Sequence, residues 1–451
     1  MDIDKIFIEK ILFPAMEIKN GNKIRKYCKG MKSSQYLSRD QLLKLQNEKL
    51  KKLLLTCIKN VKAYQQYDKL INDIEENPFE VLKKIPILNK DEFRKHSENY
   101  LNTKFDKNKL IPNSTGGSTG LPLKFYMDRF DVEHSEAARW RGLSWFDISY
   151  GSRSVMFWGN PIELSCREQK RGLIRDKVLK NRKLISAYDL SKEKLDKHIS
   201  FLNKYQPEYF YGYASAINTF CELLLAHKKD ALKLKKLKAV VTTAETLHEY
   251  QRENIKKALG CAVVNEYGAR DAGILAYECK FGHMHISAEN VLVEIVDPIT
   301  HTPLPEGESG LVVVTDLNNF AMPRLRYLLG DTATLSKEVC PCGITLPLIQ
   351  SLDGREDAMF KLPNGSLVHG HFIYHYASKY NSIMQFQLVQ KDIYNAELNI
   401  VLRDDEQGEV DDFICDLTQI LIGVKIYVNI VKNIPVSASG KVRYAIREFD
   451  L

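Results

Sequence analysis

Residues 113–124, Asn-Ser-Thr-Gly-Gly-Ser-Thr-Gly-Leu-Pro-Leu-Lys, could bind phosphate. The glycines can adopt positive φ and let backbone N–H groups approach an anion, and the hydroxyl side chains can donate hydrogen bonds. The residues concerned are Ser114, Thr115, Gly116, Gly117, Ser118, Thr119 and Gly120. The Gly-Lys-Ser/Thr of P-loop NTPases is missing, and so is the Gly-x-Gly-x-x-Gly of dinucleotide-binding folds. Taken alone, the run is as compatible with an ordinary solvated loop as with nucleotide binding.

Three cysteines and one histidine could form a metal site. Cys279 and His285 have five residues between them, and Cys340 and Cys342 form a Cys-Pro-Cys-Gly segment about fifty-five residues further on. Three thiolates and one imidazole complete a tetrahedral zinc set, and closed sets of this kind are structural. His283 is an alternative ligand, and unligated thiols in a reducing compartment are the other interpretation. We expect a structural Zn²⁺ that fixes the surrounding strands without entering catalysis.

The composition is that of a globular protein with more than one domain. The 451 residues are 44% hydrophobic and 27% charged, which allows two or more sizeable cores. The net charge of +8 comes from lysines and arginines interleaved with 57 acidic residues, a pattern typical of a solvated surface rather than a nucleic-acid-binding stripe. Nine cysteines, an odd number in a long chain, do not indicate a disulfide scaffold.

The first thirteen residues argue against a secretory signal. They contain acids, and their apolar stretch from Ile6 to Phe13 is too short and too charged for a signal peptide. No run reaches the roughly 18 to 20 apolar residues of a membrane span. We therefore expect a cytoplasmic protein. The apolar face of this first segment could contact a membrane surface or a partner, although packing against the body of the protein is the more common use.

The elements that must position these residues change along the chain. Ser38 and Gln41 form a possible capping box that opens a helical pattern over residues 38–72, and the first hundred residues are mainly helical. Between residues 154 and 264, helical stretches alternate with short β-branched runs, which is typical of an α/β sheet with ligands at the strand ends. Beyond residue 285 the pattern predicts antiparallel strands, and the last hundred residues could form a small α+β domain.

Five further segments follow the glycine-rich run in a fixed order. They are residues 242–247 (Thr-Thr-Ala-Glu-Thr-Leu), 265–271 (Asn-Glu-Tyr-Gly-Ala-Arg-Asp), 327–331 (Tyr-Leu-Leu-Gly-Asp), 354–357 (Gly-Arg-Glu-Asp) and 437–443 (Ser-Ala-Ser-Gly-Lys-Val-Arg). This order resembles the adenylate-forming superfamily of acyl-CoA synthetases, peptide-synthetase adenylation domains and luciferases. The glycine-rich run, the helical start and the Cys-Pro-Cys-Gly segment are most similar to its phenylacetate-CoA ligase branch, and within that to the CapK-like capsule-biosynthesis proteins. The resemblance covers nearly the whole chain.

The resemblance implies an α/β fold with two domains. A large adenylation domain would span residues 1–353, with a helical start, α/β sheets and an antiparallel β portion. A small, mobile α+β lid domain would span residues 354–451, with a hinge near Asp357. The implied reaction is attack of a carboxylate on the α-phosphate of ATP, which gives an acyl-adenylate and pyrophosphate. Such a reaction requires a phosphate cradle, a divalent cation and a positioned positive charge.

The resemblance also assigns roles to matching residues. Residues 114–120 would form the phosphate cradle, and Lys441 would reach from the lid to the carboxylate and the α-phosphate. Asp271 occupies the position of the family's Mg²⁺-binding glutamate, and a shorter aspartate is still a suitable oxygen ligand. Asp331 would accept hydrogen bonds from the ribose hydroxyls, and Arg355 would lie beside the nucleotide. The residues expected around adenine are Ala244, Glu245, Thr246, Glu266, Tyr267 and Gly268.

The acyl pocket is expected near three aromatic residues, Trp158, Tyr211 and Tyr213, although aromatic residues at this density are more often core. Arg270 could pair with a second carboxylate or a phosphate on a polar substrate, and a salt bridge to a nearby acid is an equally good interpretation. The predicted protein is thus an AMP-forming carboxylate ligase that uses ATP and Mg²⁺ and transfers the acyl group to CoA, an amine or an amino sugar, with surface-polysaccharide synthesis as one setting. The alternative is a nucleotide-binding protein of the same fold that has lost catalysis and serves in assembly or regulation.

Overall fold

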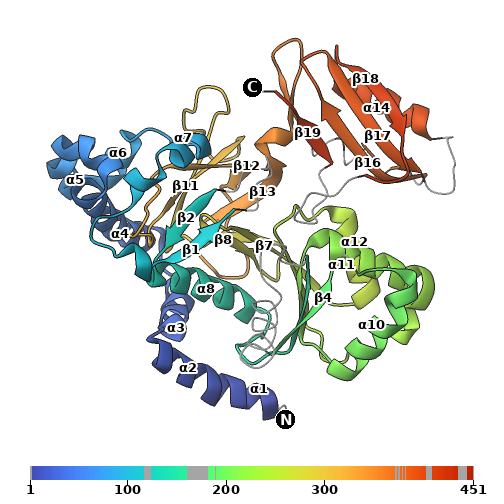
Figure 1. Ribbon diagram of the computed structural model, residues 1–451, viewed down its shortest axis with the longest axis horizontal. Coiled ribbons are helices and arrows are strands. Elements are labelled where there is room, and N and C mark those ends of the chain that lie inside the picture. The colour runs from blue at the N-terminus through green and yellow to red at the C-terminus, as the bar shows by residue number, and fades with distance from the viewer. Residues whose placement is uncertain are drawn as a thin grey trace.

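The computed structural model describes residues 3–115, 123–159, 181–187, 189–370, 373, 376–377, 379–380, 382–402, 409–434 and 444–449, apart from the side chains of Lys229, Asp357 and His369. The N-terminus lies at one end of the molecule, and the β-rich C-terminal part lies at the other (Figure 1). None of the helices in these ranges combines the length and the apolar character needed to cross a bilayer.

The first hundred residues are helical, as predicted. Ser38 caps the longest helix, since its Oγ accepts from the Gln41 backbone N–H at 3.3 Å while Gln41 Oε1 accepts from the Ser38 N–H at 3.0 Å. This helix ends at Asn60, earlier than the predicted residue 72, because Val61 takes an extended conformation. The elements are α1 (Ile3–Phe7), η1 (Ile8–Leu12), α2 (Phe13–Asn20), α3 (Ile24–Ser34), α4 (Arg39–Asn60), η2 (Lys62–Leu70), α5 (Ile71–Glu76), α6 (Pro78–Lys83), α7 (Lys90–Lys95) and η3 (Ser97–Tyr100).

A two-stranded hairpin follows the helices. After the short turn η4 (Lys107–Lys109), strand β1 (Ile111–Ser114) pairs antiparallel with β2 (Lys124–Met127), so that Ser114 lies opposite Lys124. Helix α8 (Arg129–Ser144) then begins at the N-cap Asp128, whose side chain accepts from the Asp131 N–H. The glycine-rich run therefore connects the two strands of this hairpin.

The centre of the molecule is an 11-stranded sheet with the order β10-β11-β12-β13-β9-β8-β7-β6-β5-β3-β4. Its parallel part contains β3 (Ser154–Trp158), β4 (Arg182–Ser186), β5 (Tyr209–Gly212), β6 (Ala239–Thr243) and β7 (Ala262–Ala269). Its antiparallel part contains β8 (Gly273–Glu278), β9 (Met284–Ile286), β10 (Val291–Val296), β11 (Ser309–Asp316), β12 (Tyr327–Ser336) and β13 (Leu348–Arg355).

Strand β7 joins the two parts, because it pairs parallel with β6 and antiparallel with β8. The sequence predicted both kinds of β structure, but not that they share one sheet. The predicted strand at residues 262–264 also continues to Ala269 and so includes much of the 265–271 motif.

Helices cover the two parts of the sheet differently (Figure 1). Leu50 and Leu53 of α4 belong to one core with Val312 and Leu329 of the antiparallel part. A separate core, with aromatic residues such as Phe157, packs the parallel strands against α10 (Lys192–Tyr205), α11 (Ala214–Leu223) and α12 (Glu249–Leu259). The chain after α11 continues through η5 (Leu224–Lys228) and η6 (Lys229–Ala231).

The C-terminal part has a sheet and a core of its own. The four-stranded sheet has the order β18-β17-β16-β19, and Phe386, Leu398 and Phe413 are buried in its core. This confirms the predicted α+β character, while the proposed boundary between residues 353 and 354 stays a prediction. The elements are η7 (Glu356–Ala358), β14 (Met359–Lys361), β15 (Leu367–His369), β16 (Ile383–Gln390), β17 (Asn395–Leu402), α14 (Val410–Ile420), β18 (Lys425–Ile430) and β19 (Ala445–Arg447).

Candidate functional site

Three of the sequence motifs meet at Asp331 on β12. Its Oδ1 accepts a hydrogen bond from Arg355 Nη1 of β13 at 2.9 Å, and its Oδ2 accepts from the Tyr267 hydroxyl of β7 at 2.9 Å. Burial and the neighbouring Asp331 carboxylate raise the pKa of Tyr267 well above its usual value, so the hydroxyl remains a donor. Gly330 has φ +71°, and a Cβ there would come within 3.3 Å of Arg355 Nη2. The backbone conformation and the nearby Arg355 side chain therefore explain the glycine before Asp331.

Asp271 lies in the turn between β7 and β8 and is nearly buried. Its Oδ2 accepts from the Tyr327 hydroxyl at 2.8 Å, and its backbone carbonyl accepts from Arg324 Nη2 at 2.6 Å. Arg324 in turn lies 4.8 Å from the ring centre of Phe125 on β2, a cation–π contact that helps to hold the guanidinium. These contacts fix the carboxylate in one orientation.

The hairpin that carries the glycine-rich run is closed at its base. The Thr115 N–H donates to the Leu123 carbonyl at 3.0 Å, and the Leu123 N–H donates to Thr115 Oγ1 at 3.1 Å. Arg270 Nη1 donates to the Ser114 carbonyl at 3.0 Å. This partner is neither the substrate group nor the acidic side chain that was expected for Arg270. The turn after β7 therefore touches the point at which the run leaves β1.

The residues expected around adenine take several roles. Ala244 has φ +68°, a strained conformation for a residue with a Cβ, at the end of β6. Glu245 Oε2 accepts from the Ser215 N–H at 2.9 Å near the start of α11, where the helix dipole stabilises a negative charge. Gly268 approaches the β8 backbone, since a Cβ there would lie 3.1 Å from the Gly273 carbonyl oxygen. For Thr246 the structure shows only that it is half-buried.

The carboxylate of Glu266 is almost fully buried and has three partners. It accepts from the Tyr211 hydroxyl at 2.7 Å, from Arg139 Nε at 3.2 Å and from Thr243 Oγ1 at 3.3 Å. A buried carboxylate held by an arginine and two hydroxyl groups is a rigid positioning element. Any contact between this residue and adenine would therefore involve its backbone rather than its carboxylate.

The three aromatic residues predicted for the acyl pocket lie together. Trp158 stacks on Tyr213, with ring centres 4.2 Å apart, and lies 6.3 Å from the ring of Tyr211. Tyr211 and Tyr213 are buried, while Trp158 is half-buried. Burial raises the pKa of Tyr211, whose hydroxyl is the donor to Glu266. The cluster thus adjoins the Arg139–Glu266 ion pair.

The four predicted metal ligands converge. Their ligand atoms all lie within 4.8 Å of one another, and the pairs Cys279 Sγ–Cys340 Sγ and Cys342 Sγ–His285 Nε2 are 3.6 and 3.3 Å apart. A zinc tetrahedron with bonds of about 2.3 Å to sulfur has edges of about 3.8 Å. Burial lowers the pKa of His285 to about 4, which leaves the neutral imidazole that a metal requires. His283 is not part of the group, so the geometry selects His285.

This cluster connects two segments of the sheet. Cys279 follows β8 and His285 lies in β9, whereas Cys340 and Cys342 lie in the connection between β12 and β13. Backbone N–H groups of Phe281 and Ile344 point at the sulfur atoms of Cys279 and Cys342, both at 3.4 Å. The donor set and its surroundings fit a structural Zn²⁺.

Some predicted residues fall outside the described part of the chain. They are Gly116, Gly117, Ser118, Thr119, Gly120, Lys441 and the side chain of Asp357. Conversely, Arg139, Arg324 and Tyr327 contact the site residues although no role was predicted for them. Tyr327 could have been identified from the sequence, because it stands four residues before Asp331 and side chains an even number of residues apart point to the same side of a strand.

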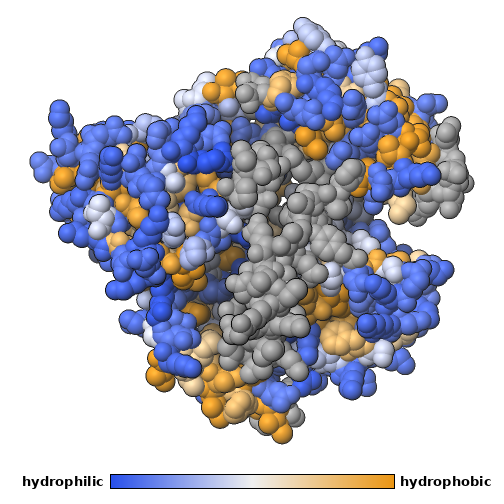
Figure 2. Space-filling view, viewed as in Figure 1, coloured by the Kyte–Doolittle hydropathy of each residue, from blue (hydrophilic) through white to orange (hydrophobic). Residues whose placement is uncertain are grey.

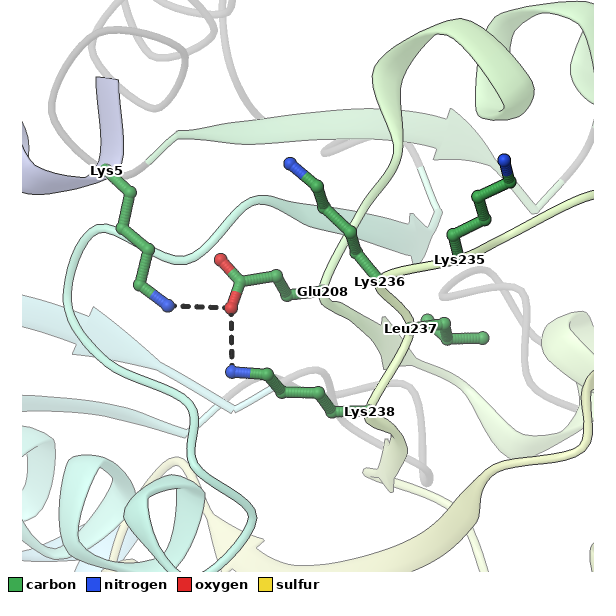
Figure 3. A pocket seen from close by; sticks show the side chains of 6 residues that line it. All are labelled: Lys5, Glu208, Lys235, Lys236, Leu237 and Lys238. Carbon is green, nitrogen blue, oxygen red and sulfur yellow. Dashed lines mark hydrogen bonds and ion pairs between the residues drawn. The ribbon is translucent and has the colours of Figure 1, made fainter. Parts of the chain in front are cut away.

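A pocket of about 380 Å³ lies elsewhere on the protein (Figure 3). It is lined by Lys5, Glu208, Lys235, Lys236, Leu237 and Lys238. Glu208 precedes β5 and therefore lies at the amino end of the parallel strands, away from the carboxyl ends where ligands of such sheets bind. Burial opposes ionisation of this carboxyl, but hydrogen bonds from Lys238 and Lys5 together lower the pKa of Glu208. None of the predicted site residues lines this pocket.

Comparison with known proteins shows which proteins the chain resembles. It is 27% identical to Protein CapK of Staphylococcus aureus over 423 residues, which cover 90% of this chain and 89% of CapK. Residues 360–448 match the family model of the CapK C-terminal domain. The chain therefore resembles CapK over nearly its whole length. This CapK-like chain is also 27% identical to a phenylacetate-coenzyme A ligase of Thermus thermophilus, over 72% of each protein.

A solved structure supports the same relationship at the level of the fold. The CapK-like chain superimposes on 2-hydroxyisobutyryl-CoA ligase in complex with 2-HIB-AMP with a TM-score of 0.70, over 89% of each chain and with 18% identity. The predicted α/β fold with a C-terminal α+β part and the predicted resemblance to AMP-forming ligases are thereby confirmed.

Proposed function

We propose that this chain is an ATP-dependent carboxylate ligase that forms an acyl-adenylate and pyrophosphate and then transfers the acyl group to CoA. The observation that carries the proposal is the contact between motifs far apart in sequence. Tyr267, Asp331 and Arg355 form one connected group, and the adjacent turn binds Tyr327 through Asp271 and Ser114 through Arg270. Relatives over most of the chain include a phenylacetate-coenzyme A ligase, which supports the reaction type.

Asp331 is the proposed ribose ligand. Each oxygen of an ionised carboxylate can accept about two hydrogen bonds, and one on each oxygen is already used by Arg355 or Tyr267. One position per oxygen is left for the 2′ and 3′ hydroxyls of ATP. Since the side chain is 19% exposed, a ligand can reach it. Arg355 and Tyr267 would then orient the carboxylate rather than contact the reacting atoms.

Asp271 is the proposed Mg²⁺ ligand. Its Oδ2 is held by Tyr327, so Oδ1 is left as the hard oxygen ligand that Mg²⁺ prefers. When bound together with ATP, the cation would neutralise charge on the phosphates. The run from Ser114 to Gly120 would hold the phosphates by its N–H and hydroxyl donors, and Lys441 would supply positive charge at the carboxylate and the α-phosphate.

The proposal also covers the acid pocket, the acceptor, the zinc cluster and the cell compartment. The acid would bind near Trp158 and Tyr211, beside the rigid Arg139–Glu266 ion pair. An amine or amino sugar is the second candidate acceptor, and a role in surface-polysaccharide synthesis rests on the resemblance to capsule-biosynthesis proteins alone. The Cys279, His285, Cys340 and Cys342 cluster would bind structural Zn²⁺. Because ATP is the co-substrate, we propose that the enzyme works in the cytoplasm.

Exchange of labelled pyrophosphate into ATP, measured with a library of carboxylic acids, tests the first half-reaction. One class of acids should support exchange, and Lys441→Ala should reduce it by about two orders of magnitude or more. Lys432→Ala, a change of an exposed lysine in the same C-terminal part, is the matched control and should behave as the parent does. If no acid gives exchange above the Lys441→Ala level, the ligase proposal fails. Retained ATP binding would then favour the catalytically inactive alternative.

A further inference from the structure

The first helical segment, Ile3–Asn20, carries apolar side chains on its outer side. Ile3, Phe7, Ile11 and Ile18 are 78%, 49%, 58% and 82% exposed, and Ile6 is also exposed. Figure 2 shows apolar surface at the lower end of the molecule, where α1 and α2 lie in Figure 1. We call these five residues the apolar face. Single exposed apolar residues are common, but five on one short segment indicate a surface that binds something.

The inner side of the same segment is already packed. Ile8 and Phe13 are buried, and the rings of Phe13 and Tyr150 lie 4.5 Å apart. The backbone approaches closely as well, because a Cβ at Gly151 would lie 2.2 Å from the Lys5 carbonyl oxygen. Packing against the body of the protein, the use expected from the sequence, is therefore fulfilled by the inner side alone. It leaves the apolar face exposed in a fixed orientation.

The acidic residues of the segment all have partners on the protein. Asp4 forms an ion pair with Arg153 at 3.1 Å, and Glu9 accepts from Ser149 Oγ at 2.8 Å. Glu17 is buried and accepts from the backbone and the side chain of Arg25. Glu17 is thus removed from the surface, and the charge of Asp4, whose side chain is 71% exposed, is offset by Arg153, which reduces the opposition of these acids to an anionic surface.

The adjoining chain is strongly basic. Residues 18–39 contain no acid and seven basic residues, namely Lys19, Lys23, Arg25, Lys26, Lys29, Lys32 and Arg39. Helix α3 buries Cys28 and Met31 and exposes Lys26, Lys29 and Lys32. Within the described ranges, these three lysines form no ion pair with an acid. Lys5 also borders the pocket of Figure 3, which is lined by four lysines and one glutamate, and both Lys5 and Lys238 bind that glutamate.

We propose that the Ile3–Asn20 segment and α3 bind the surface of an anionic lipid bilayer. The apolar face would enter the boundary between headgroups and acyl chains, and the lysines of α3 would contact lipid phosphates. A second copy of the chain is a poorer partner, because a symmetric contact would bring two basic helices together. The inference does not depend on the ligase proposal. It places whatever reaction the chain performs at a membrane surface.

Vesicle flotation of the full chain tests the inference. The parent protein should float with vesicles of phosphatidylcholine and phosphatidylglycerol in equal parts, much less with phosphatidylcholine alone, and less as salt is raised. The Ile3→Ser/Phe7→Ser/Ile11→Ser variant should lose at least about tenfold in partitioning, because it removes large apolar side chains. Ile299→Ser/Val339→Ser/Ile422→Ser, which changes three exposed apolar residues elsewhere, is the matched control and should float as the parent does.

The charge contribution has its own variant. Lys26→Glu/Lys29→Glu/Lys32→Glu should weaken binding to the anionic vesicles by more than about fivefold per position. Lys95→Glu/Lys337→Glu/Lys432→Glu makes the same change in net charge elsewhere and should have a much smaller effect. Thermal melting checks that each variant folds, and the comparison of the two vesicle types on the parent protein needs no variant.

Three results would overturn the inference. The parent protein could fail to float with anionic vesicles, or the apolar-face variant could float as well as its control. The third is a dimer of the parent protein that the apolar-face variant converts to a monomer, which would make the face a self-interface.

Discussion

Removal of the Asp331 carboxylate should weaken ATP binding through the ribose. A hydrogen bond to a charged group contributes about 1.5–3 kcal/mol, so loss of two ribose contacts in Asp331→Ala should cost at least about 3 kcal/mol, or more than about a hundredfold in Kd. The variant should still fold. Arg355 is 41% exposed, so the lost ion pair costs about 1 kcal/mol or less. The unpaired Tyr267 hydroxyl adds about 1–3 kcal/mol.

A comparison of nucleotides separates the ribose contact from general damage to the site. Isothermal titration calorimetry with ATP and 2′-deoxy-ATP should show about tenfold weaker binding of the deoxy nucleotide to the parent protein, and nearly equal binding of both to Asp331→Ala. Asp353→Ala is the control, because it removes a carboxylate on the neighbouring strand β13 that accepts a hydrogen bond from Ser309 Oγ, and it should keep the parent's discrimination. If Asp331→Ala discriminates between the two nucleotides as the parent does, Asp331 does not bind the 2′ hydroxyl.

Three more predictions concern stability. The protein should contain about one equivalent of zinc by elemental analysis, and chelation or Cys340→Ser should lower its melting temperature, whereas a metal-free protein that melts unchanged with chelator would contradict the site. Glu289→Gln leaves the fully buried Arg141 without the carboxylate that it binds at 2.8 and 3.0 Å, and should cost about 3–5 kcal/mol in urea unfolding. Arg141→Met/Glu289→Leu should recover most of that loss, and a double variant no more stable than Glu289→Gln would refute this. Burial and the neighbouring Asp316 raise the pKa of Asp131 well above its usual value. The contribution of this group to the free energy of unfolding is therefore fully present below the pKa of an unfolded aspartate and is lost as pH rises through the raised pKa. Asp131→Asn should therefore be more stable than the parent at about pH 8 and lose less stability between about pH 5 and pH 8, and equal slopes for the two proteins would argue against it.

The local elements were predictable from the sequence because their causes are local. Ser38 and Gln41 are three residues apart and satisfy each other's backbone groups, so the start of α4 needs no distant partner. Strands β3, β5, β6 and β7 follow from short runs between helical stretches, whereas β4 was not predicted. The metal ligands were recognisable because few residue types bind zinc. Closely spaced cysteines and histidines can therefore be identified from the sequence alone.

Partners across long distances were not predictable. Glu266 was expected beside adenine, yet its carboxylate binds Arg139 of α8 and Tyr211 of β5, which only the packing of three elements brings together. Arg270 was expected to bind an acid or a ligand, and it binds the Ser114 carbonyl because the turn after β7 lies against β1. The joining of parallel and antiparallel strands at β7 is likewise a property of the whole sheet.

Neighbouring residues of a strand point to opposite faces of its sheet. On β7, Glu266 is directed to Arg139 and Tyr211, and the next residue, Tyr267, is directed to Asp331. Under the proposed function, the acid is selected on one face of the sheet and the nucleotide is bound on the other, and a single peptide unit of β7 separates the two. Substitutions on the α8 side could change which acid is accepted while ATP binding stays intact. A shift of β7 itself would disturb both tasks together.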